Sequence, residues 1–202
     1  ASETHIPLTD PGVGVEVVAD HGAQSVRLRL TPLPPAVRTM LLDFATVSQA
    51  SAVVQGIIAA GVIPAALEMM DRNMTLAVEE FVHAGLPLDA AALLLVEVDG
   101  TPADVEMATA VVERVAQGHS VRTVRVAADE DERALLWKAR KSAFGAVARV
   151  KPSYYLHDCV VPRTKLVEIM EAIGEITDRE GVICLNVFHA GDGNLHPIIA
   201  LD

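Results

Sequence analysis

Two histidines, His189 and His196, lie on either side of the dipeptide Asp192-Gly193, and this segment constrains the fold more than any other part of the chain. An Asp-Gly dipeptide favours a two-residue hairpin turn of type I′, whose central residues both adopt positive φ. In that register His189 and His196 are directly opposed on the two strands. Because cross-strand partners hold their Cβ atoms about 4.5–5.5 Å apart, both imidazoles are expected to reach one divalent metal ion or one anionic group.

The histidine pair alone does not complete a metal site, since a catalytic zinc or manganese ion normally takes about three protein ligands. Asp192 and Asn194 add polar groups beside the pair, and the apolar run at residues 182–185 predicts a buried strand that leads into the turn. The sequence therefore predicts a functional site at His189, His196 and Asn194, with zinc or manganese held by the two histidines. The alternative is a hairpin whose histidines are packed for structural reasons.

Patterns typical of strands and helices alternate along the chain. Strands are predicted at residues 37–46, 65–70, 92–98, 121–127 and 154–161, and on both sides of the hairpin turn. Helices are predicted at residues 47–60, 73–84, 101–117, 130–150 and 163–179. This alternation fits a parallel doubly wound sheet, and equally ferredoxin-like βαβ units that share an antiparallel sheet. The glycine-rich strand-to-helix turns of a nucleotide-binding parallel sheet are missing from the sequence.

The balance of charges limits the classes of partner. The 202 residues carry a formal net charge of −11, which argues against nucleic acid or an anionic membrane surface, because both need a basic face. An anionic substrate needs local positive charge, for which the candidates are Arg140, Lys141 and the histidine pair. No apolar stretch approaches the roughly 18–20 residues that span a bilayer. No membrane insertion is therefore expected, and the expected location is the cytoplasm.

Residues 189–197 (HAGDGNLHP) resemble the signature of the C-terminal, substrate-side domain of FAD-linked 2-hydroxyacid oxidases and dehydrogenases. This family of flavoproteins, in the vanillyl-alcohol oxidase superfamily, includes glycolate oxidase, D-lactate dehydrogenase and D-2-hydroxyglutarate dehydrogenase. Segments 30–34 (LTPLP), 63–71 (IPAALEMMD), 136–141 (LWKARK) and 158–163 (DCVVPR) are similar to further family segments in the same order. The resemblance implies an α+β fold of ferredoxin-like βαβ repeats, with helices packed on an antiparallel sheet.

The resemblance also implies a domain organisation. Residues 32–202 are identified as the FAD-linked oxidase C-terminal (cap) domain, and residues 1–31 are expected to form an extended N-terminal arm or remnant with a strand at residues 24–30. Family members begin with an FAD-binding domain, whose Gly- and Ser-rich pyrophosphate-binding segment has no counterpart here. Downstream of the histidine hairpin they carry a Glu-His-Gly segment that supplies a further ligand and a base. The sequence stops at Asp202 before such a segment, so the domain is expected to be cropped at its C-terminus.

Arg140 is the expected substrate-binding residue. The resemblance places an arginine here that binds the substrate carboxylate, a task that suits a planar guanidinium. The alternative is a solvated helix arginine paired with Glu132 or Asp131. Where some relatives carry a threonine and a lysine, this sequence has Phe144 and Leu156, which favours a small monocarboxylate over a dicarboxylate such as 2-hydroxyglutarate.

Two functions from different classes fit the sequence. The first is the substrate-binding cap of an FAD-dependent 2-hydroxyacid oxidase or dehydrogenase of the glycolate or D-lactate type. FAD would then lie mainly on another domain or subunit, so the chain alone is expected to be inactive, and its partners would be that domain and a small 2-hydroxy acid. The second is a stand-alone α+β metal- or ligand-binding module without redox activity.

Overall fold

The computed structural model describes residues 16–21, 24–29 and 33–202, and the chain forms two compact units, residues 1–35 and 36–202. In the first unit, β1 (Glu16–His21) and β2 (Gln24–Arg29) pair as a two-stranded antiparallel sheet. β2 agrees with the strand predicted at residues 24–30, whose last residue lies outside the described residues, whereas β1 was not predicted.

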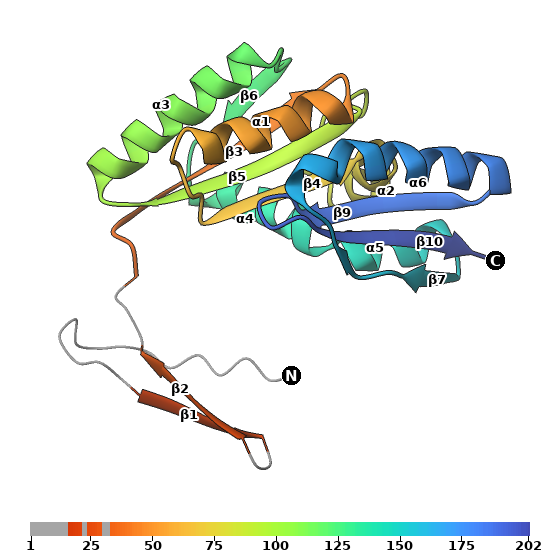
Figure 1. Cartoon of the computed structure of the whole chain (residues 1–202), viewed down its shortest axis with the longest axis horizontal. Helices are drawn as coiled ribbons and strands as arrows, with labels where there is room; N and C mark the ends of the chain where they lie inside the picture. The colour runs from red at the N-terminus through yellow and green to blue at the C-terminus, as the bar shows by residue number, and fades with distance from the viewer. Residues whose placement is uncertain (1–15, 22–23, 30–32) are drawn as a thin grey trace. The chain divides into compact units, whose positions relative to one another are not determined.

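An eight-stranded sheet forms the centre of the second unit (Figure 1). Its strands are β3 (Ala36–Phe44), β4 (Ala66–Asp71), β5 (Ala92–Gly100), β6 (Thr123–Val126), β7 (Ser153–Leu156), β8 (Cys159–Val160), β9 (Ile183–His189) and β10 (Asn194–Leu201). Seven of them follow the order β6-β3-β5-β4-β9-β10-β7, and β8 also pairs with β10. Every pairing is antiparallel, which rules out the parallel doubly wound sheet.

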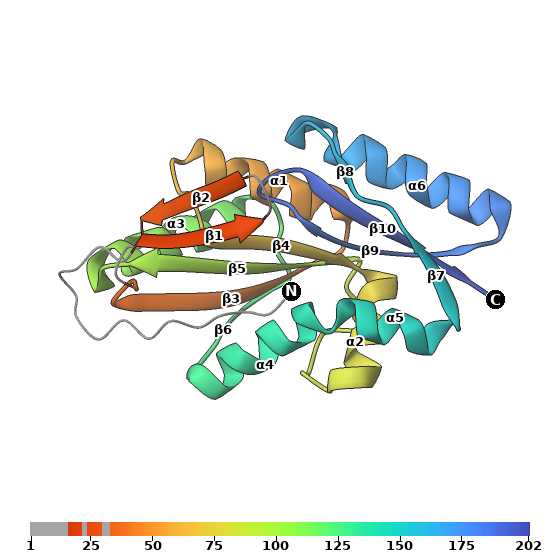
Figure 2. The same cartoon turned by 90° about the horizontal axis from the view of Figure 1, so that it is seen from below.

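Helices cover both faces of this sheet (Figures 1 and 2). One face carries α1 (Val47–Ala59), α3 (Pro102–Gly118) and α6 (Leu166–Glu180), the last preceded by a 3₁₀ turn, Arg163–Lys165. The other face carries α2 (Arg72–Val82), α4 (Glu130–Lys141) and α5 (Ala143–Val150). Successive strand residues alternate between the two cores, as Leu94 and Leu93 do. Because both faces of the sheet are buried, the chain needs a high hydrophobic content, which is 51%. Aliphatic side chains and methionine make up most of the two cores, so few aromatic residues are present.

The strand order corresponds to two ferredoxin-like units joined edge to edge. In the first ferredoxin-like unit, β3-α1-β4 and β5-α3-β6 interlock so that β3 and β5 lie side by side between β6 and β4. In the second, β7, α6, β9 and β10 give the order β9-β10-β7, which corresponds to the first three strands of the same arrangement. β4 pairs with β9 and joins the two ferredoxin-like units into one sheet. The predicted α+β fold is confirmed.

Side-chain caps fix the start of each helix that follows a strand of the first ferredoxin-like unit. α1, α2, α3 and α4 each begin after a residue whose side chain accepts a hydrogen bond from an N–H of the first turn: Thr46, Asp71, Thr101 and Asp129. Thr46 and Thr101 also form reciprocal capping boxes. The predicted helix start at Thr101, with proline in the first turn, is confirmed.

The prediction of one helix over residues 130–150 is wrong. The helix breaks at Ser142, which has φ −84° and ψ 0° and whose N–H bonds to the carbonyls of both Lys138 and Ala139. The break redirects α5 so that it packs on α2, with Gly145 facing Phe81. Serine competes for backbone hydrogen bonds and tolerates such a break, but the apolar positions continue through it, and this continuity led to the prediction of a single helix.

The strand predicted at residues 154–161 is also interrupted. β7 ends at Leu156 and β8 begins at Cys159, and both pair with β10. His157 and Asp158 lie between them, where the N–H of His157 still bonds to the carbonyl of Pro197. The interruption frees Asp158 from strand alternation, so its side chain can turn toward the histidine pair.

We predict that the chain folds without residues 1–24. All members of the two core clusters among the described residues lie at or beyond Ala36, so removal of this segment takes no buried apolar side chain from them. A chain that begins at Leu30 should unfold cooperatively, with a midpoint within a few degrees of that of the full chain, as measured by circular dichroism on heating. An insoluble product, or a melt without a cooperative transition, would show that the residues before Leu30 are an integral part of the fold.

Candidate active site

The turn that carries the histidines is longer than predicted. β9 ends at His189 and β10 begins at Asn194, and these two residues are paired, so the turn spans the four residues 190–193. The N–H groups of Asp192 and Gly193 donate to the carbonyl of His189 at 3.2 and 3.1 Å. Within the turn only Gly193 has a positive φ, of 73°, whereas a type I′ turn needs two such residues. The predicted two-residue turn, and with it the direct opposition of His189 and His196, is therefore wrong.

The two histidines nevertheless lie side by side. His196 pairs with Val187, two residues before His189, so the histidines are diagonal neighbours on one face of β9 and β10. Their ring centroids are 5.4 Å apart and the ring planes are nearly perpendicular, at 87°. Val187 and Ile198 share this face by alternation and belong to the core beneath α2, α4 and α5. The site therefore lies on the face that carries α4, the helix of Arg140.

Arg140 reaches the same region and is paired there with Glu68 of β4. Its Nε and Nη2 donate to Oε2 of Glu68 at 3.0 and 2.7 Å. Only 10% and 9% of the two side chains are exposed. The alternative interpretation of a solvated arginine paired with Glu132 or Asp131 is wrong, since Glu132 binds Arg125.

The second oxygen of Glu68 contacts His189. β4 and β9 are neighbours, Glu68 is directly opposite His189, and Glu68 Oε1 lies 2.7 Å from His189 Nδ1. Arg140, Glu68 and His189 therefore form one continuous hydrogen-bonded row. A carboxylate on one ring nitrogen orients an imidazole and leaves the other nitrogen for a ligand. His189 is the more accessible end of the row, with 44% of its side chain exposed.

His196 has a different environment from His189. Only 13% of its side chain is exposed, and its ring centroid is 6.5 Å from that of Phe144. Burial lowers the pKa of His196 below 6.5; Asp158 acts in the opposite direction, and the neighbouring His189 and Arg140 lower it further. His196 is therefore neutral at neutral pH.

Two buried polar atoms at this site have no hydrogen-bond partner in the part of the chain that the structure describes: Oδ1 of Asn194 and Nδ1 of His196. Buried polar atoms in folded proteins nearly always have a partner, and leaving one unpaired costs about 1–3 kcal/mol. The Asp158 carboxylate approaches His196 Nδ1 only to 3.5 Å. The arrangement indicates a place where a ligand, water or groups from another part of the protein complete the hydrogen bonding.

A hollow of about 450 Å³ opens beside Glu68 and His189. Apolar residues from the end of α1, the connection to β4 and the start of β4 line it together with Arg163, Gly191 and Asp192, whereas Arg140, Asn194 and His196 are not among its lining residues. Arg163 Nη1 donates to the carbonyl of Gly191 at 3.1 Å and so holds the turn against the segment that precedes α6. Small-molecule sites typically have volumes of about 300–1,000 Å³, so this hollow suits a small ligand.

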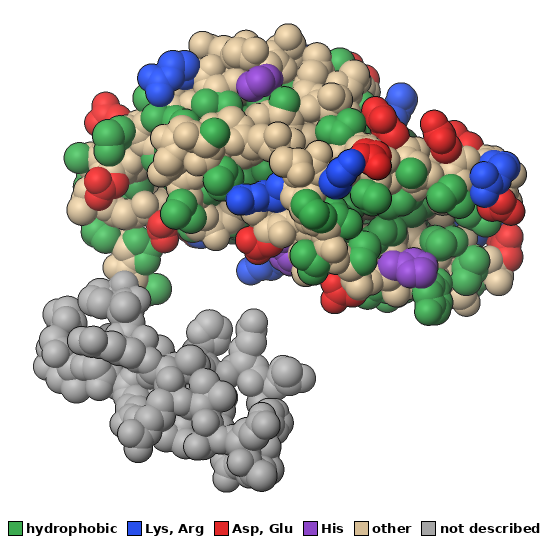
Figure 3. Space-filling model, viewed as in Figure 1, with side chains coloured by type: hydrophobic (Ala, Val, Ile, Leu, Met, Phe, Trp, Pro, Cys, Tyr) green, Lys and Arg blue, Asp and Glu red, His purple; other side chains and the backbone are tan. Residues whose placement is uncertain are grey.

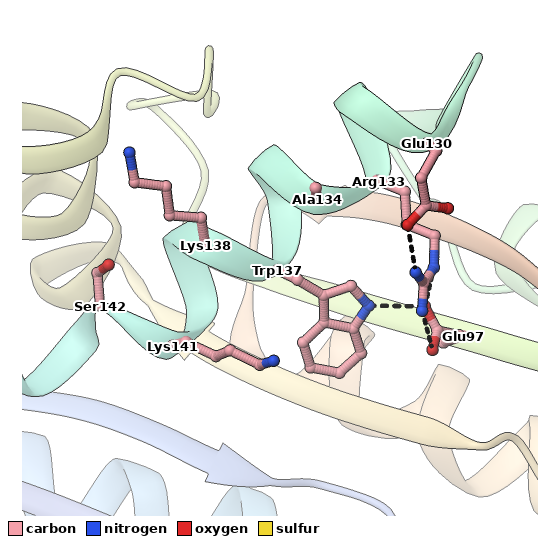
Figure 4. Close-up of a pocket in the computed structure, with 8 residues that line it drawn as sticks. All are labelled: Glu97, Glu130, Arg133, Ala134, Trp137, Lys138, Lys141 and Ser142. Atoms are coloured by element: carbon pink, nitrogen blue, oxygen red, sulfur yellow. Dashed lines mark hydrogen bonds and ion pairs between the residues drawn. The ribbon is translucent and has the colours of Figure 1, made fainter. Parts of the chain in front are cut away.

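The residues predicted from the sequence do not all meet. Arg140, His189, His196 and Asn194 come together, whereas Lys141 points elsewhere. Its Nζ lies 5.8 Å from the ring centroid of Trp137, and it lines a separate hollow of about 560 Å³ (Figure 4). No group of three or more His, Cys, Asp or Glu side chains suited to a metal ion occurs among the described residues.

Sequence reasoning missed two residues of the site, Glu68 and Asp158. Glu68 lies within the apolar strand segment Leu67–Met70, where it is the one charged side chain. A carboxylate in a strand buried on both faces needs a buried partner, and this pattern was the available signal. Asp158 offered no such signal, because its approach to His196 depends on the interruption between β7 and β8.

On the face drawn in Figure 3, Lys and Arg side chains are scattered among acidic and apolar ones and do not form a basic field. Among the described helices, none is both long and apolar enough to cross a membrane.

Comparison with known families gives one match over most of the chain. The family described as FAD linked oxidases, C-terminal domain, matches residues 33–202. Among curated proteins, the glycolate oxidase subunit GlcD of Escherichia coli K12 is 44% identical over 177 residues, which cover 88% of this chain and 36% of that protein. GlcD of Bacillus subtilis is 37% identical, and the mitochondrial D-lactate dehydrogenase [cytochrome] of Arabidopsis thaliana is 28% identical. These alignments cover 87% and 88% of this chain, and 37% and 31% of the two relatives. The chain thus spans about a third of the length of these relatives.

Solved structures share the fold at low sequence identity. An alkyldihydroxyacetonephosphate synthase superposes with a TM-score of 0.65 at 14% identity, over 87% of this chain and 38% of that one. A p-cresol methylhydroxylase with substrate bound gives 0.63 at 11% identity, over 88% of this chain and 42% of that one. These matches support the fold over 87% and 88% of this chain and say nothing about the substrate.

Proposed function

Because this chain belongs to the family of FAD-linked oxidase C-terminal domains, we propose that it is the substrate-binding part of an FAD-dependent 2-hydroxyacid oxidase or dehydrogenase. The two relatives that are 44% and 37% identical are named as glycolate oxidase subunits, and one that is 28% identical as a D-lactate dehydrogenase. The proposed substrate is accordingly a small 2-hydroxy acid of the glycolate or D-lactate type.

The observation that carries this proposal is the pair of unpartnered buried atoms beside a buried guanidinium. A 2-hydroxy acid offers a carboxylate and an adjacent hydroxyl group. Arg140 supplies a fixed positive charge, and Asn194 and His196 supply polar atoms that lack partners among the described residues. The carboxylate and hydroxyl group of the substrate thus have candidate partners in Arg140, Asn194 and His196. The rest of the substrate is not specified by these residues.

Each residue has a proposed role. Arg140 orients the carboxylate by charge-assisted hydrogen bonds. His189 and His196 face the hydroxyl group, and a neutral imidazole there can take up its proton. The unpartnered Oδ1 of Asn194 can only accept a hydrogen bond, so its proposed donor is the hydroxyl group of the substrate. Phe144, which lies near His196, limits the room beyond the hydroxyl carbon and favours a small monocarboxylate.

The sequence has no Gly- and Ser-rich segment of the kind that binds the pyrophosphate of FAD in the family. Free N–H groups at a helix start are the usual binding site for such a group; α1, α2, α3 and α4 are each capped by their own side chain, whereas α5 and α6 have no side-chain cap. We therefore propose that FAD is held mainly by a separate domain or subunit. When bound, it would supply the acceptor for the hydride from the hydroxyl carbon. The roles proposed for Arg140, His189, His196 and Asn194 are binding, orientation and proton uptake.

We predict that the purified chain is colourless and does not oxidise glycolate or D-lactate with an artificial dye. The same chain should restore dye-linked oxidation when it replaces the matching segment of the Escherichia coli glycolate oxidase protein GlcD, to which it is 44% identical. His196→Ala in this chimera should abolish the activity, and His83→Ala, a residue at the end of α2, should not. A folded, flavin-containing chimera that oxidises neither acid would contradict the proposed function and favour a stand-alone binding module.

A divalent metal is the second proposed ligand of the histidine pair. Two imidazoles whose rings are 5.4 Å apart suit zinc or manganese. They supply two of the about three protein ligands that such a site needs, so binding by this chain is expected to be weak.

We predict that zinc binding, measured by calorimetry, depends on both His189 and His196. Replacing either histidine by alanine should abolish zinc binding, because a single imidazole binds the ion too weakly to be detected. Affinity should fall as pH drops below about 6.5, since a ligand imidazole must be neutral. His196 should keep its neutral form to lower pH than an ordinary histidine, because its pKa is lowered. Equal binding by the native chain and both variants would remove the metal from the proposal.

A further inference from the structure

Glu68 contacts two functional groups at once, one with each carboxylate oxygen. Oε2 accepts both hydrogen bonds from Arg140, and Oε1 lies 2.7 Å from Nδ1 of His189. We infer that Glu68 is a positioning residue, which fixes His189 in the tautomer protonated on Nδ1 and couples its orientation to that of Arg140. The meaning of this for catalysis rests on the proposed function, whereas the tautomer itself does not.

Glu68 carries a negative charge in the folded chain. Arginine remains protonated in proteins, and Arg140 is nearly buried with Glu68 as its carboxylate partner. A neutral Glu68 would leave a buried guanidinium without a counter-charge, which is strongly unfavourable. The carboxyl group of Glu68 is therefore ionised.

The charge of Glu68 assigns the proton on His189. An ionised carboxylate accepts hydrogen bonds and cannot donate one. The contact of 2.7 Å between Glu68 Oε1 and His189 Nδ1 is a hydrogen bond only if Nδ1 carries the proton. In the neutral imidazole, Nε2 then carries the lone pair. The row thus presents Nε2 of His189 as an acceptor, ready for a hydroxyl proton or a metal ion.

Arg140 retains one end for a ligand. Nε and Nη2 are committed to Glu68, and Nη1 forms no hydrogen bond within the part of the chain that the structure describes. Nη1 is therefore the end of the guanidinium that can meet a substrate carboxylate. Because one carboxylate holds both Arg140 and His189, a shift of Glu68 would move the carboxylate anchor and the acceptor nitrogen together.

The chain offers a matched control in Glu97 of β5. Glu97 lies diagonally from Glu68 on the same face, since Glu97 pairs with Ala66. It too binds α4, through Arg133 at 2.9 and 3.1 Å and through the indole N–H of Trp137 at 2.6 Å (Figure 4). Glu97 therefore matches Glu68 in burial and in its link to α4, but it has no contact with His189.

The test reads the tautomer directly. Long-range ¹H–¹⁵N correlation spectra of the 202-residue chain, recorded at a pH where the imidazoles are neutral, distinguish a protonated ring nitrogen from one with a lone pair. We expect His189 of the native chain to be protonated at Nδ1 only. In Glu68→Gln this preference should be lost, because the glutamine amide can either donate to Nδ1 or accept from it. In Glu97→Gln the His189 signals should keep the native pattern.

Two outcomes would overturn the inference: a native His189 protonated at Nε2, or an equal loss of the preference in Glu97→Gln and Glu68→Gln. If Glu68→Gln does not fold, the double variant Glu68→Gln/Arg140→Met, which lacks the unpaired guanidinium, is measured instead. The spectrum of the native chain tests the predicted Nδ1 protonation of His189 without any variant. The spectra need no substrate, metal or flavin. An inactive chimera therefore counts against the proposed function, and an Nε2-protonated His189 counts against this inference.

Discussion

Gly193→Ala is expected to lower the free energy of unfolding by about 3 kcal/mol or more, from backbone strain and a steric clash together. A Cβ atom at this position would lie 2.2 Å from the carbonyl oxygen of Val161, and the residue has φ of +73°. The two segments lie this close because the N–H of Val161 donates a hydrogen bond to the carbonyl oxygen of Gly193. The substitution must therefore either distort the turn or separate it from the segment after β8. Urea unfolding followed by circular dichroism measures the loss.

Gly181→Ala provides the control for this prediction. Gly181 ends α6 with φ of +66°, but among the described residues, apart from its own chain neighbours, no atom lies within 4 Å of its added Cβ. It should lose only the conformational term, about 1 kcal/mol. If both variants lose the same stability, the tight contact between the histidine turn and Val161 does not exist in solution.

Arg140→Met is expected to cost about 3–5 kcal/mol of stability, the range for a buried ion pair that loses one partner. Methionine keeps most of the side-chain volume but leaves the Glu68 carboxylate, of which 9% is exposed, without its counter-charge. Because the penalty comes from the orphaned carboxylate, the double variant Glu68→Gln/Arg140→Met should recover much of it. Urea unfolding of the two single variants and the double variant measures the coupling. Strictly additive losses would mean that the two side chains do not interact.

The fold was largely predictable because its signals are local. The alternation of apolar residues and the cap at Thr101 give most strands and helices within a few residues of their observed bounds. What local signals could not give was the strand direction, since βαβ patterns precede both parallel and antiparallel sheets. The resemblance of residues 189–197 to a known family supplied that choice.

The site was predicted in its residues but not in its geometry. Asp192-Gly193 indicates a turn, yet the turn length is set by contacts remote in sequence, from Val161 and Arg163. The partner of Arg140 is 72 residues away, on β4, so the helix sequence alone pointed to the wrong carboxylates. Ser142 shows the same limit, because the helix break there serves the packing of α5 on α2.

The most direct test of a substrate site at the histidine pair is an NMR titration of the isotopically labelled chain with glycolate, followed through the histidine ring signals. Ethylene glycol, which lacks the carboxylate, is the control ligand, and His83, His119 and His157 are internal reference residues. We predict that glycolate shifts the signals of His189 and His196 together and to saturation, that ethylene glycol does not, and that Arg140→Lys weakens the effect. Saturable shifts confined to the reference histidines, or equal shifts with both ligands, would contradict a substrate site at the histidine pair.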